Sequence, residues 1–156
     1  MRSKRGEGYI QVSVLIIVIC MILAGFVTFA GAVNVVRLTE RNAKTVLESY
    51  VMKNSIRIYD SIKQGTNETD AIDREEFIGD LIEFCTFYKS GDFLYHYNAD
   101  GEADYYITTP QVEFSEVNKL RLIVKYETYI PIYFAGRYVS TAVVPITVKL
   151  NLEQKF

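Results

Sequence analysis

The chain contains no tryptophan, one histidine, two cysteines and three prolines among its 156 residues. Two cysteines, Cys20 and Cys85, are too few for a disulfide framework. His96 has no cysteine or second histidine at the spacing of a zinc site, and the acidic turn at residues 98–104 is too short for a calcium loop. No phosphate loop, dinucleotide fingerprint or G-x-S-x-G motif occurs. We therefore expect no catalytic residue, metal or cofactor, and a protein that is not an enzyme.

A further absence concerns charge, because residues 12–33 hold no charged side chain. As a helix rising about 1.5 Å per residue, this run spans about 33 Å, enough for the roughly 30 Å core of a bilayer. The basic residues Arg2, Lys4 and Arg5 precede the run and a long domain follows it. This arrangement predicts a single transmembrane helix at residues 12–33, with a basic cytoplasmic leader at residues 1–11 and the C-terminal domain outside.

The part of the chain that follows the apolar run is mildly acidic. From residue 34 onward it carries 14 basic and 18 acidic side chains, a net charge of −4. Such a surface is a poor electrostatic match for nucleic acid, so we expect no nucleic-acid partner. Residues 34–156 are enough for one small extracytoplasmic domain rather than two.

Residues 34–64 are expected to continue the membrane helix into water. This stretch lacks proline and glycine, and Leu47, Val51 and Ile58 recur at helical spacing among charged side chains. Gly65 is a typical C-terminal stop. The apolar run is therefore predicted to be one end of a longer rod.

A second helix is predicted within residues 67–90. Asn67 or Thr69 is placed to cap it, and acidic residues crowd its first turns, where the helix dipole favours negative charge. An apolar stripe follows at helical spacing: Ile78, Leu81, Ile82 and Cys85. Ser90 and Gly91 are expected to end the segment.

The final third of the chain alternates between apolar and polar residues, which predicts strands. These lie at residues 93–97 and 104–108, from Leu120 toward Pro131, and over residues 138–152. Residues 98–101 form the turn of the first hairpin, Pro131 closes or bends the third strand, and Pro145 indicates an edge or a bulge. The predicted fold class is α+β: a long N-terminal helix, a second helix, and an antiparallel sheet of about four strands within residues 93–156.

Within the apolar run, small residues form a strip along one side of the predicted helix. Ala24, Thr28 and Ala32 are spaced four residues apart, and Gly25 lies beside them. Small residues let another helix approach closely in lipid, where apolar burial gives no driving force. We therefore predict helix packing at these four positions.

Three interpretations of the N-terminus remain open at this point. The first is a plain membrane anchor. The second is a cleaved secretory signal, because Ala30-Gly31-Ala32 fits an A-x-A-like site, although the apolar stretch is longer than a usual signal core. The third is a short basic leader that is removed ahead of the apolar run, so that the apolar helix is retained.

The segment KRGEGYIQVSVLIIVICMILAG resembles the class III signal segments of bacterial Tad-type pilins and TadE-like pseudopilins. In that pattern a short basic leader ends in glycine, and a glutamate lies five places after the cut. The matching positions here are Gly6 as the last leader residue, Glu7 as the new first residue, and Gln11 in place of the glutamate. Near the other end, LRLIVKYETYIPIYF followed by YVSTAVVPITVKL is similar to the strand, proline, strand ending of TadE-like proteins.

The resemblance implies a structural minor pseudopilin, or an assembly component of a pilus, secretion or conjugation apparatus, in the bacterial cytoplasmic membrane. Its partners would be other pilin-like subunits, bound through the N-terminal helix, and a prepilin peptidase that cuts between Gly6 and Glu7. Gln11 would make the intersubunit contact, with a hydrogen bond but no ion pair. The neutral Gln11 suits a minor or initiating subunit better than a major filament subunit.

A different class of function stays open beside this one. The second hypothesis, ranked behind the first, is a single-pass membrane protein whose outer domain binds a ligand or partner. That alternative predicts a concave, partly apolar site in the sheet domain and no self-association through the membrane helix.

Overall fold

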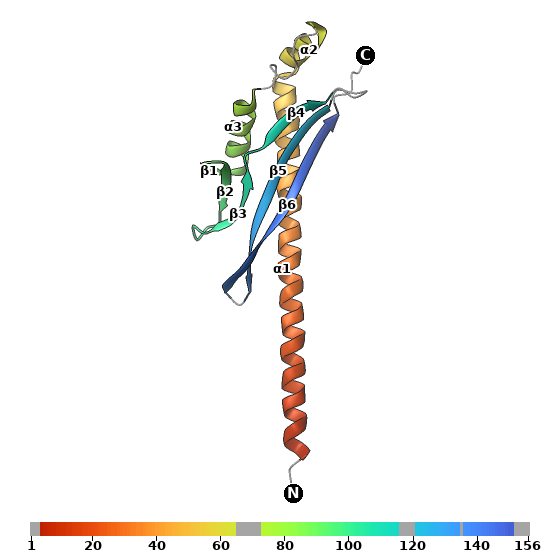
Figure 1. Cartoon of the computed structure of the whole chain (residues 1–156), viewed down its shortest axis with the longest axis vertical. Helices are drawn as coiled ribbons and strands as arrows, with labels where there is room; N and C mark the ends of the chain where they lie inside the picture. Colours follow the sequence, from red (N-terminus) through yellow and green to blue (C-terminus); the bar gives the residue numbers. More distant parts are fainter. Residues whose placement is uncertain (1–3, 65–72, 116–120, 135, 152–156) are drawn as a thin grey trace.

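The structure is a computed structural model that describes residues 4–64, 73–115, 121–134 and 136–151. Its dominant element is α1 (Lys4–Lys53), one unbroken helix of 50 residues. The N-terminal half of α1 stands clear of the other elements, and its C-terminal half packs against a small domain (Figure 1). Burial follows the sequence pattern, because residues 8–23 are all exposed while Ala43, Leu47 and Tyr50 are fully buried.

The predicted continuous rod ends earlier than residue 64. The helix is interrupted at Asn54, and α2 (Ser55–Gln64) follows, inclined to α1 in Figure 1. Asn54 is buried, and both its backbone N–H (3.0 Å) and its side-chain amide (3.3 Å) donate to the carbonyl of Tyr50. A side chain that competes for a backbone acceptor in this way disturbs a helix locally.

The second packed helix is shorter than the sequence predicts. α3 spans Arg74–Cys85, and its N-cap is Asp73, whose side chain accepts hydrogen bonds from the N–H groups of Glu75 and Glu76. The predicted caps Asn67 and Thr69 lie outside the described residues. The end at Ser90 is wrong, because Thr86 takes a left-handed conformation (φ 56°) and turns the chain into a strand.

The junction of α1 and α3 is held by a buried tyrosine and an ion pair. The Tyr50 hydroxyl accepts from the N–H of Asp73 (2.9 Å) and donates to its carbonyl (3.3 Å), and its ring meets Phe77 edge to face. Lys53 Nζ lies 2.8 Å from Glu76 Oε1, which raises the pKa of Lys53. The α3 start is thereby fixed on the last turns of α1.

The α+β fold class is confirmed, and the antiparallel sheet has six strands within the described residues, where the sequence predicts about four. The strands are β1 (Tyr88–Ser90), β2 (Phe93–Tyr97), β3 (Ala103–Thr108), β4 (Gln111–Ser115), β5 (Arg121–Phe134) and β6 (Arg137–Asn151). The short strands β1 and β4 are the two that the alternation pattern did not predict. β6 pairs with β5 along its whole length, so β3 and β4 share the other edge of β5.

The core lies between one face of this sheet and the helices α1 and α3. Its buried members come from every layer: Ala43, Val46, Leu47, Tyr50, Phe77, Ile78, Leu81, Leu94, Tyr105, Ile107, Leu122, Val124, Tyr126, Ile130, Ile146 and Val148. The C-terminal half of α1 is therefore part of the domain, and the N-terminal half is a continuation of a core element.

The end of the sheet near the middle of α1 is a two-stranded ribbon, which we call the β5–β6 hairpin (residues 130–134 and 137–144). β3 pairs with β5 only at Thr128 and Tyr129, so beyond them β5 has a neighbour on one side only among the described residues. Pro131 lies in that part without ending the strand, as sheet prolines do at edges. Figure 1 shows the hairpin running beside α1 toward its N-terminal half.

Candidate functional site

The exposed part of α1 is long and apolar enough to cross a membrane. Its most apolar 18-residue window has a mean hydropathy of 2.9, and 0% of that window is buried within the chain. Large aliphatic side chains such as Leu15, Ile17 and Leu23 remain more than half exposed. A surface of this size and composition is expected where a protein meets lipid or another apolar surface.

The predicted processing and contact residues lie at the free end of this helix. Gly6 and Glu7 belong to the first turns of α1. Gln11 is exposed. The helix also runs without a break through Ala30-Gly31-Ala32, the alternative cleavage site. The leader predicted at residues 1–11 is therefore continuous with the apolar helix from Lys4 onward.

Three of the four residues of the predicted packing strip, namely Gly25, Thr28 and Ala32, lie on the side of α1 that faces the chain's own β5–β6 hairpin. Ala24, Thr28 and Ala32 are partly buried, whereas Gly25 is exposed. The Thr28 hydroxyl donates to the carbonyl of Ala24 (3.0 Å), so it is satisfied within the helix. Ala32 packs against the edge of the core.

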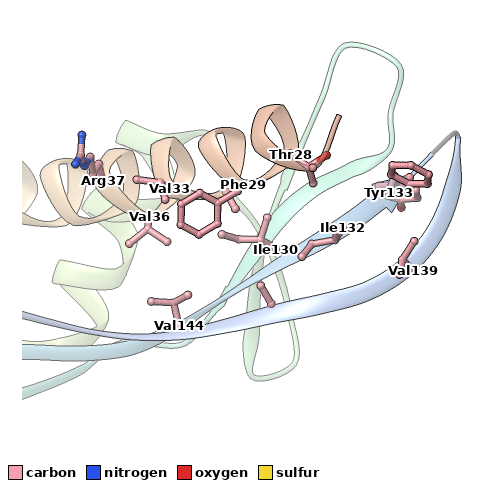
Figure 2. A pocket seen from close by; sticks show the side chains of 14 residues that line it. Thr28, Phe29, Val33, Val36, Arg37, Ile130, Ile132, Tyr133, Val139 and Val144 are labelled. Atoms are coloured by element: carbon pink, nitrogen blue, oxygen red, sulfur yellow. The ribbon is translucent and has the colours of Figure 1, made fainter. Parts of the chain in front are cut away.

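Between this strip and the hairpin lies an apolar groove of about 710 Å³. Its α1 wall consists of Gly25, Thr28, Phe29, Ala32, Val33 and Val36, and its hairpin wall of Ile130, Ile132, Tyr133, Phe134, Val139, Ala142 and Val144. The one charged residue in the lining is Arg37. Figure 2 shows Arg37 at one end of the groove, with Tyr133 and Val139 at the other end.

Sequence reasoning missed the hairpin side of this groove. Tyr133, Phe134, Tyr138 and Val139 surround the turn at Gly136 (φ +73°) and are 49%, 39%, 60% and 61% exposed. The available signal was local: apolar and aromatic residues occur there on both faces of the strands, which breaks the alternation of a half-buried sheet.

The outer face of the sheet carries a row of tyrosines across four strands. The register pairs Tyr88 with Tyr95, Tyr95 with Tyr106, and Tyr106 with Tyr129. The Tyr95 and Tyr106 rings stack at 5.1 Å, and those of Tyr106 and Tyr129 at 4.9 Å. Because their faces cover one another, these rings stabilise the strand pairing rather than present an open stacking platform.

His96 and the acidic turn at residues 98–104 both belong to the β2–β3 hairpin. His96 Nδ1 lies 3.8 Å from Asp104 Oδ2, beyond hydrogen-bond distance. Asn98 accepts hydrogen bonds from the N–H groups of Asp100 and Glu102, which confirms the acidic segment as a hairpin turn. Within the described ranges, no group of three or more histidine, cysteine or acidic residues is placed to hold a metal ion.

Cys85 is buried in the core, and burial raises the pKa of its thiol from 9.0 to about 11. In a Cys20→Ser chain at pH 8, we expect alkylation of Cys85 to be about 100-fold slower in the folded than in the urea-unfolded protein, because two pKa units remove that much thiolate. Timed iodoacetamide labelling followed by mass spectrometry measures both rates. Equal rates would show that the thiol is accessible and ionised in the folded domain.

No family model, curated protein or solved structure matches this chain.

Proposed function

We propose that the protein is a structural subunit of the TadE-like pseudopilin kind, held in a bacterial cytoplasmic membrane by α1 and assembled with other subunits through that helix. One observation carries the proposal: a single helix exposes only uncharged, mostly apolar surface over residues 12–23 and forms part of the domain core from Thr39 to Tyr50. Because the anchor and the core are one helix, any movement of the anchor in an assembly moves the outer domain with it.

The surface offered to a neighbouring helix is the part of α1 that the described chain leaves uncovered. A Cβ built on Gly25 meets no atom within 4 Å, so no contact within the described residues requires a glycine there. Gly25, Thr28 and Ala32 line the groove on the hairpin side, and Ala24 does not. We therefore propose the subunit contact over residues 11–23, with Ala24 at its edge.

Gln11 is exposed near the start of this surface and would lie close to the membrane boundary. A neutral amide both donates and accepts hydrogen bonds, and it enters lipid at lower cost than an unpaired carboxylate. This supports a minor or initiating position, in which a subunit is joined by one neighbour rather than by a repeating series of ion pairs.

The mature N-terminus tests the processing step. Membranes from the native host, or from a host that carries a prepilin peptidase, are purified and the intact mass of the protein is measured. A chain that starts at Glu7 supports the proposal, and Gly6→Leu should then block the cut. A start at Val33 indicates secretion, and an unprocessed N-terminus indicates a permanent anchor; either result contradicts processing.

Assembly is tested by cross-linking in the native membrane. In a Cys20→Ser chain, which keeps only the buried Cys85, one cysteine is introduced at Ala24 or at Thr28 and oxidised, with Tyr88→Cys as the matched exposed control outside α1. We expect dimers through position 24, fewer through position 28, which faces the hairpin, and none through position 88. Absence of any dimer through the helix would contradict assembly by helix packing.

A single-pass binding protein is the second candidate, and the apolar groove is the observation that favours it. That candidate predicts a concave, partly apolar site, and the groove has this character. However, the groove begins at Gly25 and Thr28, within the apolar run, rather than in the water-facing part of the sheet. A soluble ligand would have to enter it at the depth of the membrane.

A further inference from the structure

The β5–β6 hairpin reaches a depth that the apolar run assigns to lipid. Thr28 and Gly25 line the groove against the hairpin, and they lie nine and twelve residues before Arg37, the first charged residue after the run. At about 1.5 Å per residue, the tip is therefore about 13–18 Å below Arg37 along α1. If residues 12–33 span a bilayer, the tip lies below the membrane surface.

The tip has the composition of a membrane-interface element. Tyr133, Phe134, Tyr138 and Val139 are exposed, so the described part of the chain leaves them uncovered. Tyrosine is favoured at the boundary between lipid and water, where its ring is in contact with acyl chains and its hydroxyl with polar groups. Arg137 at the turn has a long side chain that can extend toward the headgroups.

The groove behind the tip has no unsatisfied polar group on its α1 wall below Arg37. Its one hydroxyl there, on Thr28, already donates to Ala24. Water would find few hydrogen-bond partners on such an apolar surface, whereas an acyl chain is apolar as well. Arg37 is at the far end, toward the outer domain, where the phosphate of a lipid headgroup would lie (Figure 2).

We propose that the β5–β6 hairpin enters the leaflet on the domain side, and that the groove holds an acyl chain of a phospholipid whose phosphate pairs with Arg37. This inference rests on the membrane span in the proposed function. A second copy of the chain is a poorer occupant of the groove. A parallel helix at equal depth would offer Arg37 only an uncharged run and a second Arg37, and no negative charge. A phosphate supplies the opposite charge that Arg37 requires.

The absence of tryptophan from the chain allows a direct test of depth, because one introduced tryptophan is a unique fluorophore. The full chain with Val139→Trp is reconstituted into phosphatidylcholine–phosphatidylglycerol vesicles, with or without brominated acyl chains. Leu15→Trp reports the membrane span, and Tyr97→Trp, at a position 43% exposed on β2, reports the water-facing domain. We expect bromolipid to quench the fluorescence of the Val139→Trp and Leu15→Trp chains at least about twofold and to leave that of the Tyr97→Trp chain unchanged.

The two proposals can fail separately. Quenching of the Leu15→Trp chain without quenching of the Val139→Trp chain overturns the hairpin inference and leaves the anchor intact. Failure to quench the Leu15→Trp chain overturns the anchor itself. Emission from the Val139→Trp chain that is shifted to the blue but not quenched shows burial against a second copy, which also overturns the lipid inference.

The headgroup contact has its own matched control, since Arg37 and Arg41 are both exposed on α1 but only Arg37 lines the groove. Native mass spectrometry of the detergent-purified chain measures retained phospholipid. Arg37→Gln should reduce retention about tenfold, as expected for loss of one charge-assisted hydrogen bond, and Arg41→Gln should not. Equal retention by the two variants would overturn the assignment of the phosphate to Arg37.

Discussion

Tyr50→Ala is expected to lower the free energy of unfolding of the domain formed by the sheet, α3 and the C-terminal half of α1 by about 3–5 kcal/mol, the usual cost of removing a large buried aromatic ring. Tyr50 is 0% exposed, lies in the core at the junction of α1 and α3, and has its ring centroid 5.9 Å from that of Phe77. The substitution also removes both hydrogen bonds to Asp73. Since small domains are stable by only about 5–15 kcal/mol, this loss brings the domain near the limit of folding.

Two further substitutions distinguish the contribution of the Tyr50 ring to stability from that of its hydroxyl, and from the effect of removing an exposed tyrosine. Burial raises the pKa of Tyr50, so the hydroxyl stays protonated and keeps donating to Asp73. Tyr50→Phe should cost about 1–3 kcal/mol, because it leaves the Asp73 N–H without its partner. Tyr88→Ala, at a ring that is 61% exposed, should cost less than either. Urea unfolding of the detergent-solubilised chain, followed by near-ultraviolet circular dichroism, gives all three values. Equal losses for Tyr50→Ala and Tyr88→Ala would contradict a core role for Tyr50.

The elements that the sequence predicts well are those set by a local pattern. The long helix follows from a stretch without proline, and without glycine after Gly31, and its buried face repeats at Ala43, Leu47 and Tyr50. The long strands follow from strict alternation, as in Leu122 and Val124 of β5. In each case the pattern lies in residues that are close together in the sequence. The element can therefore be predicted without knowledge of tertiary contacts.

The features that the sequence did not predict depend on contacts between distant segments or on single unusual residues. The interruption at Asn54 depends on a buried amide that bonds to the Tyr50 carbonyl, and asparagine also occurs in regular helices. The end of α3 depends on Thr86 in a left-handed conformation, which glycine usually supplies. The groove requires β5 and β6 residues to lie beside α1 residues about a hundred positions earlier, and no local pattern records that juxtaposition.

The groove also changes what the small residues of α1 indicate. From sequence, Ala24, Gly25, Thr28 and Ala32 form one strip for one neighbouring helix. In the structure Gly25, Thr28 and Ala32 all line the groove, but Ala32 packs against the core whereas a Cβ added to Gly25 would meet no atom within 4 Å. A contact within the chain therefore explains the small side chain at Ala32, and no contact within the described residues explains the glycine at position 25. Gly25 is the position where a partner outside the chain remains the better explanation.

The double variant Ile19→Arg/Ile22→Arg is expected to release the protein from the membrane, whereas Ile22→Arg alone is expected to stay. The run at residues 12–33 contains thirteen leucine, isoleucine, valine and phenylalanine residues, which together favour insertion by about 4–8 kcal/mol. One central arginine costs about 2.5–3.5 kcal/mol, so two are needed to offset that sum. Ile19 and Ile22 are 47% and 54% exposed, so the outer domain should fold unchanged.

The matched control is Met52→Arg/Ile56→Arg, two large apolar residues that are 79% and 78% exposed at the other end of the helical rod. If the side chains of both pairs are exposed to water, the two double variants should distribute alike between the membrane and soluble fractions. If residues 12–33 lie in lipid, only the Ile19/Ile22 pair should move to the soluble fraction after carbonate extraction of membranes. If the Ile19→Arg/Ile22→Arg variant stays in the membrane pellet, a bilayer span at residues 12–33 is contradicted. No other segment of the described chain covers these two positions, so the two arginines would lie unpaired in lipid, which is energetically costly.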